Sequence, residues 1–215
     1  MIYVFATTVD LAYEFDFKDT IKLSEEDLLK VGKYRNTDDK RRMITGRLLL
    51  LLALKELNID LNIKNIFYSH YGRPFLGDTL DFNISHSRDV VVCALSQNEK
   101  VGIDIEACEE IAFKDFHSCF NACEWNSITR APDNKTFYRF WTMKEASIKA
   151  SGKGLSIPLT DVIIRDDDTV VIHPEVWNIT RLKIHPNYIC HLASKSKKPL
   201  IKITNLTFEG FIQKL

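Results

Sequence analysis

Val101-Gly102-Ile103-Asp104-Ile105-Glu106 is the stretch that most constrains how this chain folds. Apolar and charged residues alternate along it, and alternate side chains of a β-strand point to opposite faces. Ile103 and Ile105 are therefore predicted to face a core, with Asp104 and Glu106 together on the other face. Two carboxylates on one face suit Mg²⁺, which is usually bound by one or two carboxylates and keeps some of its water. A half-buried strand with a solvated polar face is the alternative for this stretch taken alone.

A helical pattern from Phe137 to Lys149 is the second informative stretch. At 100° per residue, one stripe along it is formed by Phe137, Phe140, Trp141, Lys144 and Ile148. Glu145 lies at the edge of that stripe, and Lys149 lies one turn further along. Glu145 could complete a metal site begun by Asp104 and Glu106, and Lys149 could hold a phosphate. A Glu–Lys pair on an exposed helix is the alternative.

The third stretch, Phe82-Asn83-Ile84-Ser85-His86-Ser87, places His86 between two hydroxyls at the end of a strand. A histidine there could bind an anion or transfer a proton, and a satisfied loop histidine is the alternative. Arg73, in Tyr71-Gly72-Arg73-Pro74, and Arg42, on the first long helix, are further cationic candidates. For either arginine taken alone, a solvated surface charge is the favoured interpretation.

Both halves of the chain run in the order strand, long helix, several strands, which is typical of an α+β sandwich. For the first half we expect strands at 2–8, 63–69, 81–85 and 90–96, with helices from Ser24 and from Thr37 to Leu57. A polar segment at 97–100 marks the predicted boundary. For the second half we expect helices at 111–120, 123–129 and 135–151, and strands at 101–106, 161–165, 169–173, 181–185, 188–194 and 204–208. Gly152 is predicted to end the last helix in a left-handed conformation.

The composition of the 215 residues is that of an ordinary globular protein, with 45% hydrophobic and 27% charged residues. This excludes disordered, collagen-like and coiled-coil classes. Lys and Arg total 29 and Asp and Glu total 29, so the net charge of zero argues against general binding to nucleic acid. The five cysteines form no CxxC pair, the start MIYVFATTVD has no basic signal region, and no apolar run is long enough to span a membrane. We therefore expect a cytoplasmic protein with reduced thiols and no membrane segment.

Five motifs occur together in one order: Y-G-R-P (71–74), F-N-I-S-H-S (82–87), V-G-I-D-I-E (101–106), F-W-T-M-K-E-A-S-I-K (140–149) and G-K-G-L-S (152–156). Over residues 35–195 the sequence resembles the 4'-phosphopantetheinyl transferases of the two-lobed, surfactin-synthetase-activating type. The resemblance implies transfer of the 4'-phosphopantetheine group of coenzyme A to a serine of an apo acyl or peptidyl carrier protein. Adenosine 3',5'-bisphosphate is the other product.

The resemblance also implies a fold of two similar α/β sandwich lobes, a pseudo-dimer in one monomeric chain with the active site in the cleft between the lobes. Residues 1–98 would form the N-terminal lobe, with coenzyme A contacts. Residues 99–215 would form the C-terminal lobe, with the metal site and a carrier-binding surface at about 152–183.

The family's functional residues fall on matching positions of this sequence. The resemblance implies Mg²⁺, with Mn²⁺ as an alternative, on Asp104, Glu106 and Glu145. Coenzyme A contacts are implied for Arg42, Arg73, Ser85, His86, Asp104 and Lys149. Glu145 and Lys149 are the implied catalytic residues.

The sequence departs from the family at two of these positions. Arg73 stands where lysine is common, and arginine offers a planar fork in place of a point charge. Ala146 stands where serine is usual after the Lys-Glu pair. Two other functions remain open: a Mg²⁺-dependent hydrolase of pyrophosphate-linked nucleotides using the same carboxylates, and a binding module that has lost activity. The second would require a broken carboxylate triad.

Overall fold

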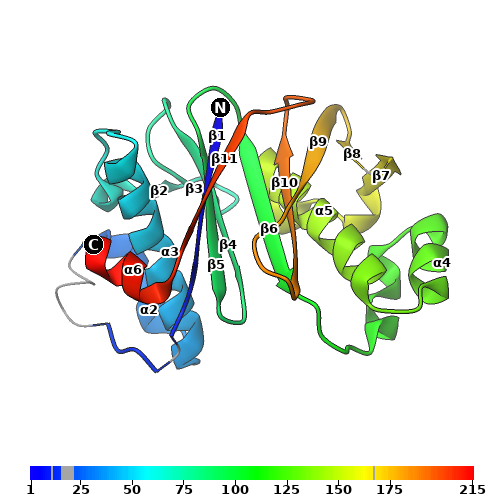
Figure 1. Ribbon diagram of the computed structural model, residues 1–215. Coiled ribbons are helices and arrows are strands. Elements are labelled where there is room, and N and C mark those ends of the chain that lie inside the picture. Colours follow the sequence, from blue (N-terminus) through cyan, green and yellow to red (C-terminus); the bar gives the residue numbers. More distant parts are fainter. Residues whose placement is uncertain (11, 16–21, 167) are drawn as a thin grey trace.

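The computed structural model describes residues 1–10, 12–15, 22–166 and 168–215. Figure 1 shows four layers across the molecule: helices, a four-stranded sheet, a five-stranded sheet, and a second set of helices. Each sheet therefore has helices on its outer face and the other sheet on its inner face. This arrangement confirms the predicted α+β fold of two sandwich lobes.

The N-terminal lobe contains a mostly antiparallel sheet in the order β11-β1-β5-β4. Its strands are β1 (Ile2–Thr8), β4 (Asp81–Ser87), β5 (Val90–Ser96) and β11 (Ile201–Leu206), of which β1 and β11 pair in parallel. The lobe's other elements are α2 (Glu25–Lys33), α3 (Thr37–Glu56), η1 (Ile63–Asn65), β2 (Phe67–Tyr68), β3 (Pro74–Phe75) and α6 (Phe208–Lys214). As predicted, Ser24 caps the start of α2, where its hydroxyl accepts a hydrogen bond from the Asp27 amide.

Helix α3 supplies most of the core of this lobe. Its side chains Leu48, Leu49 and Leu50 are fully buried in the cluster that includes Phe82 of β4. Burying one leucine side chain contributes about 1.5–3 kcal/mol, so this run fixes α3 on the sheet. Among the described residues, no helix combines the length and the apolarity that a bilayer crossing requires.

The C-terminal lobe contains an antiparallel sheet in the order β6-β10-β9-β8-β7. Its strands are β6 (Val101–Ala107), β7 (Val162–Asp166), β8 (Thr169–Ile172), β9 (Glu175–Leu182) and β10 (Tyr188–Ser194). Its helices are η2 (Phe113–Cys119), α4 (Ala122–Arg130), α5 (Lys135–Ser151), η3 (Gly154–Ser156) and η4 (Leu159–Asp161). Helix α5 packs on β6 and β10 and ends, as predicted, at Gly152 with a φ of 76°.

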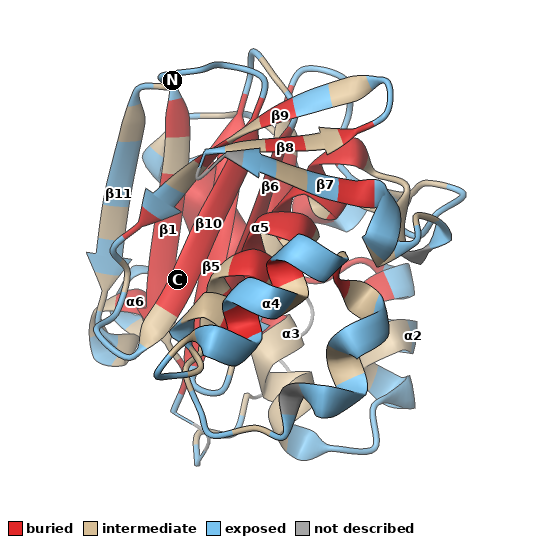
Figure 2. Ribbon diagram, turned by 90° about the vertical axis from the view of Figure 1, so that its right-hand side faces the viewer, coloured by how far each residue is buried: buried red, intermediate tan, exposed pale blue. Residues whose placement is uncertain are grey.

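The two sheets share an apolar core. Figure 2 shows strands of both sheets, among them β5, β6 and β10, largely in red. Ile103 and Ile105 of β6 face this core and are fully buried against residues such as Val4 and Val92 of the first sheet. Their side chains confirm the predicted inward face of the 101–106 strand. The opposite face of β6, with Asp104 and Glu106, is consequently turned toward α5.

The end of the chain corrects the predicted division into lobes. Residues 99–215 were assigned to the C-terminal lobe, but β11 pairs with β1 and Phe211 of α6 is buried in the N-terminal core. The chain therefore returns to its first lobe after β10. This parallel pairing joins segments far apart in sequence, which no local pattern indicates.

Several predicted elements change type or length. The predicted strand at 63–69 is a 3-10 turn followed by the two-residue strand β2, and the predicted helix at 111–120 is the 3-10 helix η2. The predicted strand at 181–185 is wrong, because β9 ends at Leu182 and a turn leads into β10. The predicted strand at 204–208 begins earlier, at Ile201, and Phe208 already starts α6.

Candidate active site

Gly102 lets helix α5 lie directly against strand β6. A β-carbon on Gly102 would lie 2.1 Å from the carbonyl oxygen of Ala146 and 2.4 Å from the amide nitrogen of Ala150, so no side chain fits there. Glu145 and Lys149 belong to the same stretch of α5. The close approach of helix and strand therefore carries these two side chains toward the carboxylates of β6.

Asp104 is a buried carboxylate with one engaged oxygen and one free oxygen. It is 3% exposed, and its Oδ1 lies 2.5 Å from Nζ of Lys149 and accepts a hydrogen bond of 3.0 Å from Oγ of Ser85. Its Oδ2 is buried and has no hydrogen-bond partner among the described residues. Burial raises the pKa of Asp104 above its ordinary value, and the ammonium group of Lys149 opposes that rise. A carboxylate oxygen left without a partner at the wall of a pocket is available to a cationic ligand.

Six of the predicted site residues line one pocket of about 310 Å³ between the lobes. Strand β4, strand β6 and helix α5 each contribute two of them. The lining residues are Ile84, Ser85, His86, Asp104, Glu106, Trp141, Glu145 and Lys149. The pocket thus combines three carboxylates with a lysine and a histidine.

The carboxylates in this pocket hold negative charge with difficulty. Burial and the neighbouring charge of Asp104 raise the pKa of Glu106 to about 7, although Ser87 donates a 2.7 Å hydrogen bond to Oε2 of Glu106. Burial and the same charge of Asp104 also raise the pKa of Glu145. Like charges confined in one site disfavour each other's ionised form. A bound cation would remove that penalty.

Positive groups lie in the pocket and near it. Partial burial lowers the pKa of His86, and the charges of Arg42 and Lys149 lower it further. Arg42 lies outside the pocket lining, on α3, where it donates to the carbonyl oxygen of Arg88 at 2.9 Å and to Oδ1 of Asp39 at 2.7 Å. Its charge nevertheless reaches His86. Two cations close enough to disfavour a protonated histidine would attract an anion to the same place.

The structure places Arg73 away from the pocket. Its guanidinium donates to Oδ2 of Asp81 at 2.6 Å, to the carbonyl oxygen of Ala150 at 2.8 Å and to that of Val101 at 2.9 Å. These partners belong to β4, the end of α5 and the start of β6. Arg73 therefore links the two lobes, and the structure does not bring it together with the other predicted coenzyme contacts.

The lysine next to Glu145 points away from the pocket. Lys144 is fully buried, and its Nζ donates to Oε2 of Glu124 at 2.8 Å and to the carbonyl oxygens of Leu159 at 2.9 Å and Cys119 at 3.2 Å. The pair ties α4, η2 and η4 to α5. The position of Lys144 on the apolar stripe indicated its burial, but nothing in the sequence identified Glu124 as its partner.

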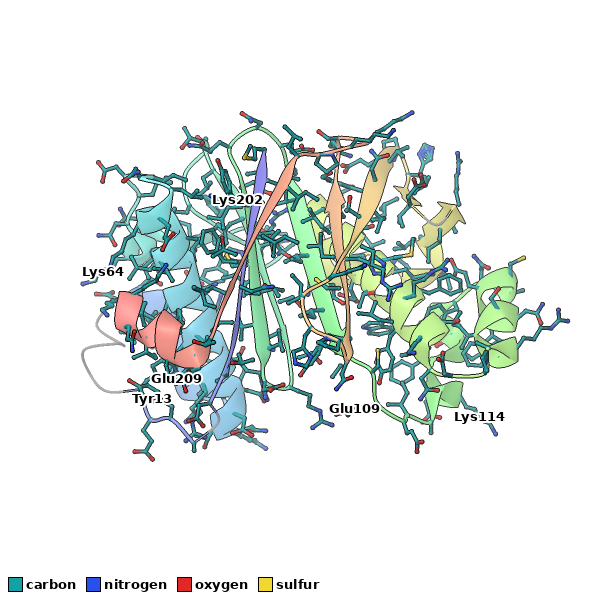
Figure 3. All side chains as sticks on the ribbon, viewed as in Figure 1. Tyr13, Lys64, Glu109, Lys114, Lys202 and Glu209 are labelled. Carbon is teal, nitrogen blue, oxygen red and sulfur yellow. The ribbon has the colours of Figure 1, made fainter. Side chains whose placement is uncertain are left out.

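Two further contacts join the lobes below the pocket, where the β4–β5 turn meets the C-terminal lobe. Arg88 of that turn forms an ion pair with Glu109, which Figure 3 labels just beyond the end of β6. The hydroxyl of Tyr188 donates to Asp89 of the same turn. No sequence pattern distinguishes these residues, since exposed charges and a turn are common in any surface segment.

The residues fit a divalent cation chemically. Among the described residues, no group of three or more His, Cys, Asp or Glu side chains is arranged as it stands to hold a metal. The unpartnered Oδ2 of Asp104 and the mutual repulsion of the carboxylates nevertheless match the hard oxygen ligands that Mg²⁺ prefers.

The fold and pocket define a two-lobed α+β protein whose candidate site contains three carboxylates, a lysine and a histidine. Comparison with known proteins identifies the family. Residues 100–199 match the 4'-phosphopantetheinyl transferase superfamily, and residues 13–98 match the N-terminal part of a 4'-phosphopantetheinyl transferase. The chain belongs to the 4'-phosphopantetheinyl transferase superfamily, and its relatives are of the Sfp type.

Three curated relatives illustrate the extent of the likeness. The transferase gsp of Aneurinibacillus migulanus is 36% identical over 155 residues, which cover 70% of this chain and 65% of gsp. Sfp of Bacillus subtilis (strain 168) is 32% identical over 149 residues, 66% of each protein. The transferase ffp of Bacillus subtilis is 32% identical over 203 residues, 88% of this chain and 90% of ffp. The matches to gsp and Sfp thus span just under two thirds of those proteins.

Proposed function

We propose that this chain transfers the 4'-phosphopantetheine group of coenzyme A to a serine of an apo acyl or peptidyl carrier protein. Family membership supports this activity, and one structural observation carries it: β4, β6 and α5 bring three carboxylates, a lysine and a histidine into one pocket between the lobes. Phosphoryl transfer needs an oriented nucleophile and neutralised phosphate charge more than it needs covalent chemistry by the protein. A pocket with both signs of charge meets those needs.

In this proposal the metal ligands are Asp104, Glu106 and Glu145. The ion is Mg²⁺, with Mn²⁺ as an alternative, and when bound it supplies Lewis-acid stabilisation of the charge on the diphosphate. The raised pKa values of Glu106 and Glu145 reflect the crowding that such an ion relieves.

The cationic side chains bind and orient the diphosphate. Lys149 lies at the pocket wall next to Asp104, and its side chain is 28% exposed. Its ammonium group can therefore stay in contact with a phosphate during transfer. His86 and Ser85 line the same wall on β4, and Arg42 adds positive charge from α3. Arg73 supports this site indirectly by holding the two lobes together, because its guanidinium already donates to acceptors in both lobes.

Glu145 is the proposed acceptor of the serine proton. The serine oxygen forms a bond to the phosphorus that carries the pantetheine, and the bond from that phosphorus to adenosine 3',5'-bisphosphate breaks. Glu145 lines the same pocket, and a carboxylate within reach of the serine hydroxyl can accept its proton.

The rest of the proposal concerns partners and setting. The carrier protein docks on the segment from about residue 152 to 183. The enzyme acts as a cytoplasmic monomer, without nucleic-acid or membrane partners. For the lobes we retain the division at residue 98, with residues 201–215 counted to the N-terminal lobe because β11 and α6 pack there.

Mass spectrometry of apo carrier proteins tests the function. The protein, coenzyme A and Mg²⁺ are incubated with a fatty-acid, a polyketide and a nonribosomal-peptide carrier in parallel. We expect at least one carrier to gain a single phosphopantetheine unit, and no gain when the metal is chelated. Cleavage of the coenzyme diphosphate with no gain on any carrier would replace the transferase with a hydrolase.

A further inference from the structure

Strand β4 buries its polar face. Phe82 and Ile84 pack into the core of the N-terminal lobe, while Asn83 and Ser85, on the opposite face, are only 6% and 5% exposed. In an antiparallel sheet packed on one side, the polar face usually meets water. Here that face lies against β6, which is the edge strand of the other sheet.

Side chains of β4 satisfy alternate amides along β6, and we call these four contacts the β4–β6 ladder. The amides of Val101, Ile103, Ile105 and Ala107 donate to Oδ2 of Asp81 (2.7 Å), Oδ1 of Asn83 (2.8 Å), Oγ of Ser85 (3.4 Å) and Oγ of Ser87 (3.1 Å). The ladder therefore joins two sheet edges through side chains, where unpaired edge amides would otherwise remain.

The ladder fixes which residues of β6 face the pocket. A slip of one residue in a strand exchanges its two faces, so it would turn Asp104 and Glu106 into the apolar core between the sheets. Acceptors on alternate β4 residues match alternate β6 amides in one register. The polar pattern D-x-N-x-S-x-S at 81–87 thus contributes to the placement of the carboxylates.

Two rungs of the ladder also touch carboxylates. Ser85 donates to Oδ1 of Asp104, and Ser87 donates to Oε2 of Glu106 at 2.7 Å while it accepts from the Ala107 amide. Among the described residues, the Asn83 rung contacts a backbone amide and no carboxylate. We propose that Ser87 is a positioning residue, which orients the Glu106 carboxylate for a divalent cation. This role rests on the proposed function, and it is separate from the coenzyme contact expected of Ser85.

A set of three variants tests the role of Ser87. Ser87→Ala removes the rung and the carboxylate contact, Ser87→Thr keeps the hydroxyl, and Asn83→Ala removes a rung that touches no carboxylate. Mn²⁺ is titrated into each full-length variant with coenzyme A and without carrier, and kcat, KM for coenzyme A and Tm are measured separately. Loss of a hydrogen bond to a metal ligand typically weakens metal binding about 10- to 100-fold.

We expect Ser87→Ala to weaken Mn²⁺ binding and lower kcat by about tenfold each, with KM for coenzyme A unchanged within about twofold. Ser87→Thr should restore both values. Asn83→Ala should lower Tm and leave Mn²⁺ affinity near wild type. If Asn83→Ala does not fold, the difference in Mn²⁺ affinity between Ser87→Ala and Ser87→Thr decides.

Wild-type Mn²⁺ affinity and kcat in Ser87→Ala would overturn the proposal. Equal losses of Mn²⁺ affinity in Ser87→Ala and Asn83→Ala would also overturn it, because the effect would then come from the backbone rung. A wild-type protein that binds no Mn²⁺ excludes the role as well. If the wild-type protein transfers nothing to any carrier while Ser87→Ala still weakens Mn²⁺ binding, the proposed function fails and the positioning role stands.

Discussion

Helix α5 carries two lysine–carboxylate pairs on its two sides, and they differ in how fully their groups are satisfied. Lys144 is fully buried and contacts Glu124 and two carbonyl oxygens. Lys149 is partly exposed at the pocket, and its partner Asp104 keeps one buried oxygen without a hydrogen bond. Removing one member of a buried pair whose groups all have hydrogen-bond partners costs stability. A pair at a pocket wall with one acceptor oxygen still unpartnered can exchange its contacts for those of a ligand. We therefore expect Lys144 to contribute to the stability of the fold and Lys149 to contribute to the reaction.

The largest expected effect is on stability, from Lys144→Met. Removing one member of a buried ion pair leaves an uncompensated charge on Glu124 and costs about 3–5 kcal/mol. Urea unfolding measures this loss, and transfer by the folded fraction should stay near the wild-type rate. Adding Glu124→Gln to the variant should recover part of the stability, because it removes the orphaned charge. A stable Lys144→Met protein without activity would move Lys144 into the active site.

Lys149→Met is the matched change on the other side of α5. We expect its transfer rate to fall by about a hundredfold, the scale of a major electrostatic contribution, since no ammonium remains to follow the phosphate. Its stability should change less than that of Lys144→Met, because the Lys149 side chain is 28% exposed and water already screens part of its attraction to Asp104. Steady-state kinetics and urea unfolding on both variants give the comparison. Similar stability losses in the two variants would erase the proposed distinction.

Glu145→Gln tests the carboxylate next to Lys144. The change keeps the shape of the side chain but removes its charge and basicity, so kcat should fall by at least about a hundredfold. Tm should remain within a few degrees, since burial and the charge of Asp104 already disfavour the ionised form of Glu145. Near-wild-type kcat in a folded Glu145→Gln protein would remove Glu145 from the site.

His191 is a second buried group that contacts α5 and is expected to affect stability and not the reaction. It is 2% exposed on β10, with Nδ1 2.7 Å from Oγ1 of Thr142, and burial, aided by the charges of Arg181 and Arg139, lowers its pKa to about 3. Between about pH 6.5 and pH 3 the unfolded chain binds a proton that the folded chain does not, so stability falls as pH falls. The contribution at pH 5 is a loss of about 2 kcal/mol relative to neutral pH. His191→Gln should flatten the dependence of unfolding free energy on pH in this range, and an unchanged slope would show that another group causes it.

The smallest effects are expected at the outer cations. Arg42→Ala and His86→Ala should each weaken coenzyme A binding by about tenfold, and less so at high salt, because charges near the surface are screened within about 8–10 Å. Repeating the calorimetric titrations with dephospho-coenzyme A identifies any residue that contacts the 3'-phosphate, since its effect then disappears.

Arg73→Lys should instead lower Tm, because a lysine cannot reach three acceptors in two lobes at once. A change in coenzyme affinity with an unchanged Tm would place Arg73 back in the site.

Local sequence patterns were sufficient for the elements that form the pocket. The alternation at 101–106 and the periodic stripe at 135–151 predicted β6 and α5, because both patterns reflect burial of one face against a neighbour. The resemblance to the family then brought Asp104, Glu106, Glu145, Lys149, Ser85 and His86 together, and the structure places all of them in one pocket.

Long-range partnerships were not predictable in this way. The return of β11 to β1, the Lys144–Glu124 pair and the engagement of Arg73 with the other lobe all depend on segments far apart in the chain. The polar face of β4 was a further case: hydroxyl and amide side chains normally indicate exposure, but here they replace backbone partners along β6. These contacts form only when the two lobes are assembled, so they produce no periodic pattern in the sequence.

The location of coenzyme A and the cation tests the central claim, that the pocket between β4, β6 and α5 is the reaction site. A crystal structure with coenzyme A and Mn²⁺, with the metal located by its anomalous scattering, decides this directly. We predict a manganese peak among the carboxylates of Asp104, Glu106 and Glu145, with the coenzyme diphosphate between it and the Lys149–His86 wall. Manganese and diphosphate bound outside this pocket in an actively transferring protein would contradict the account.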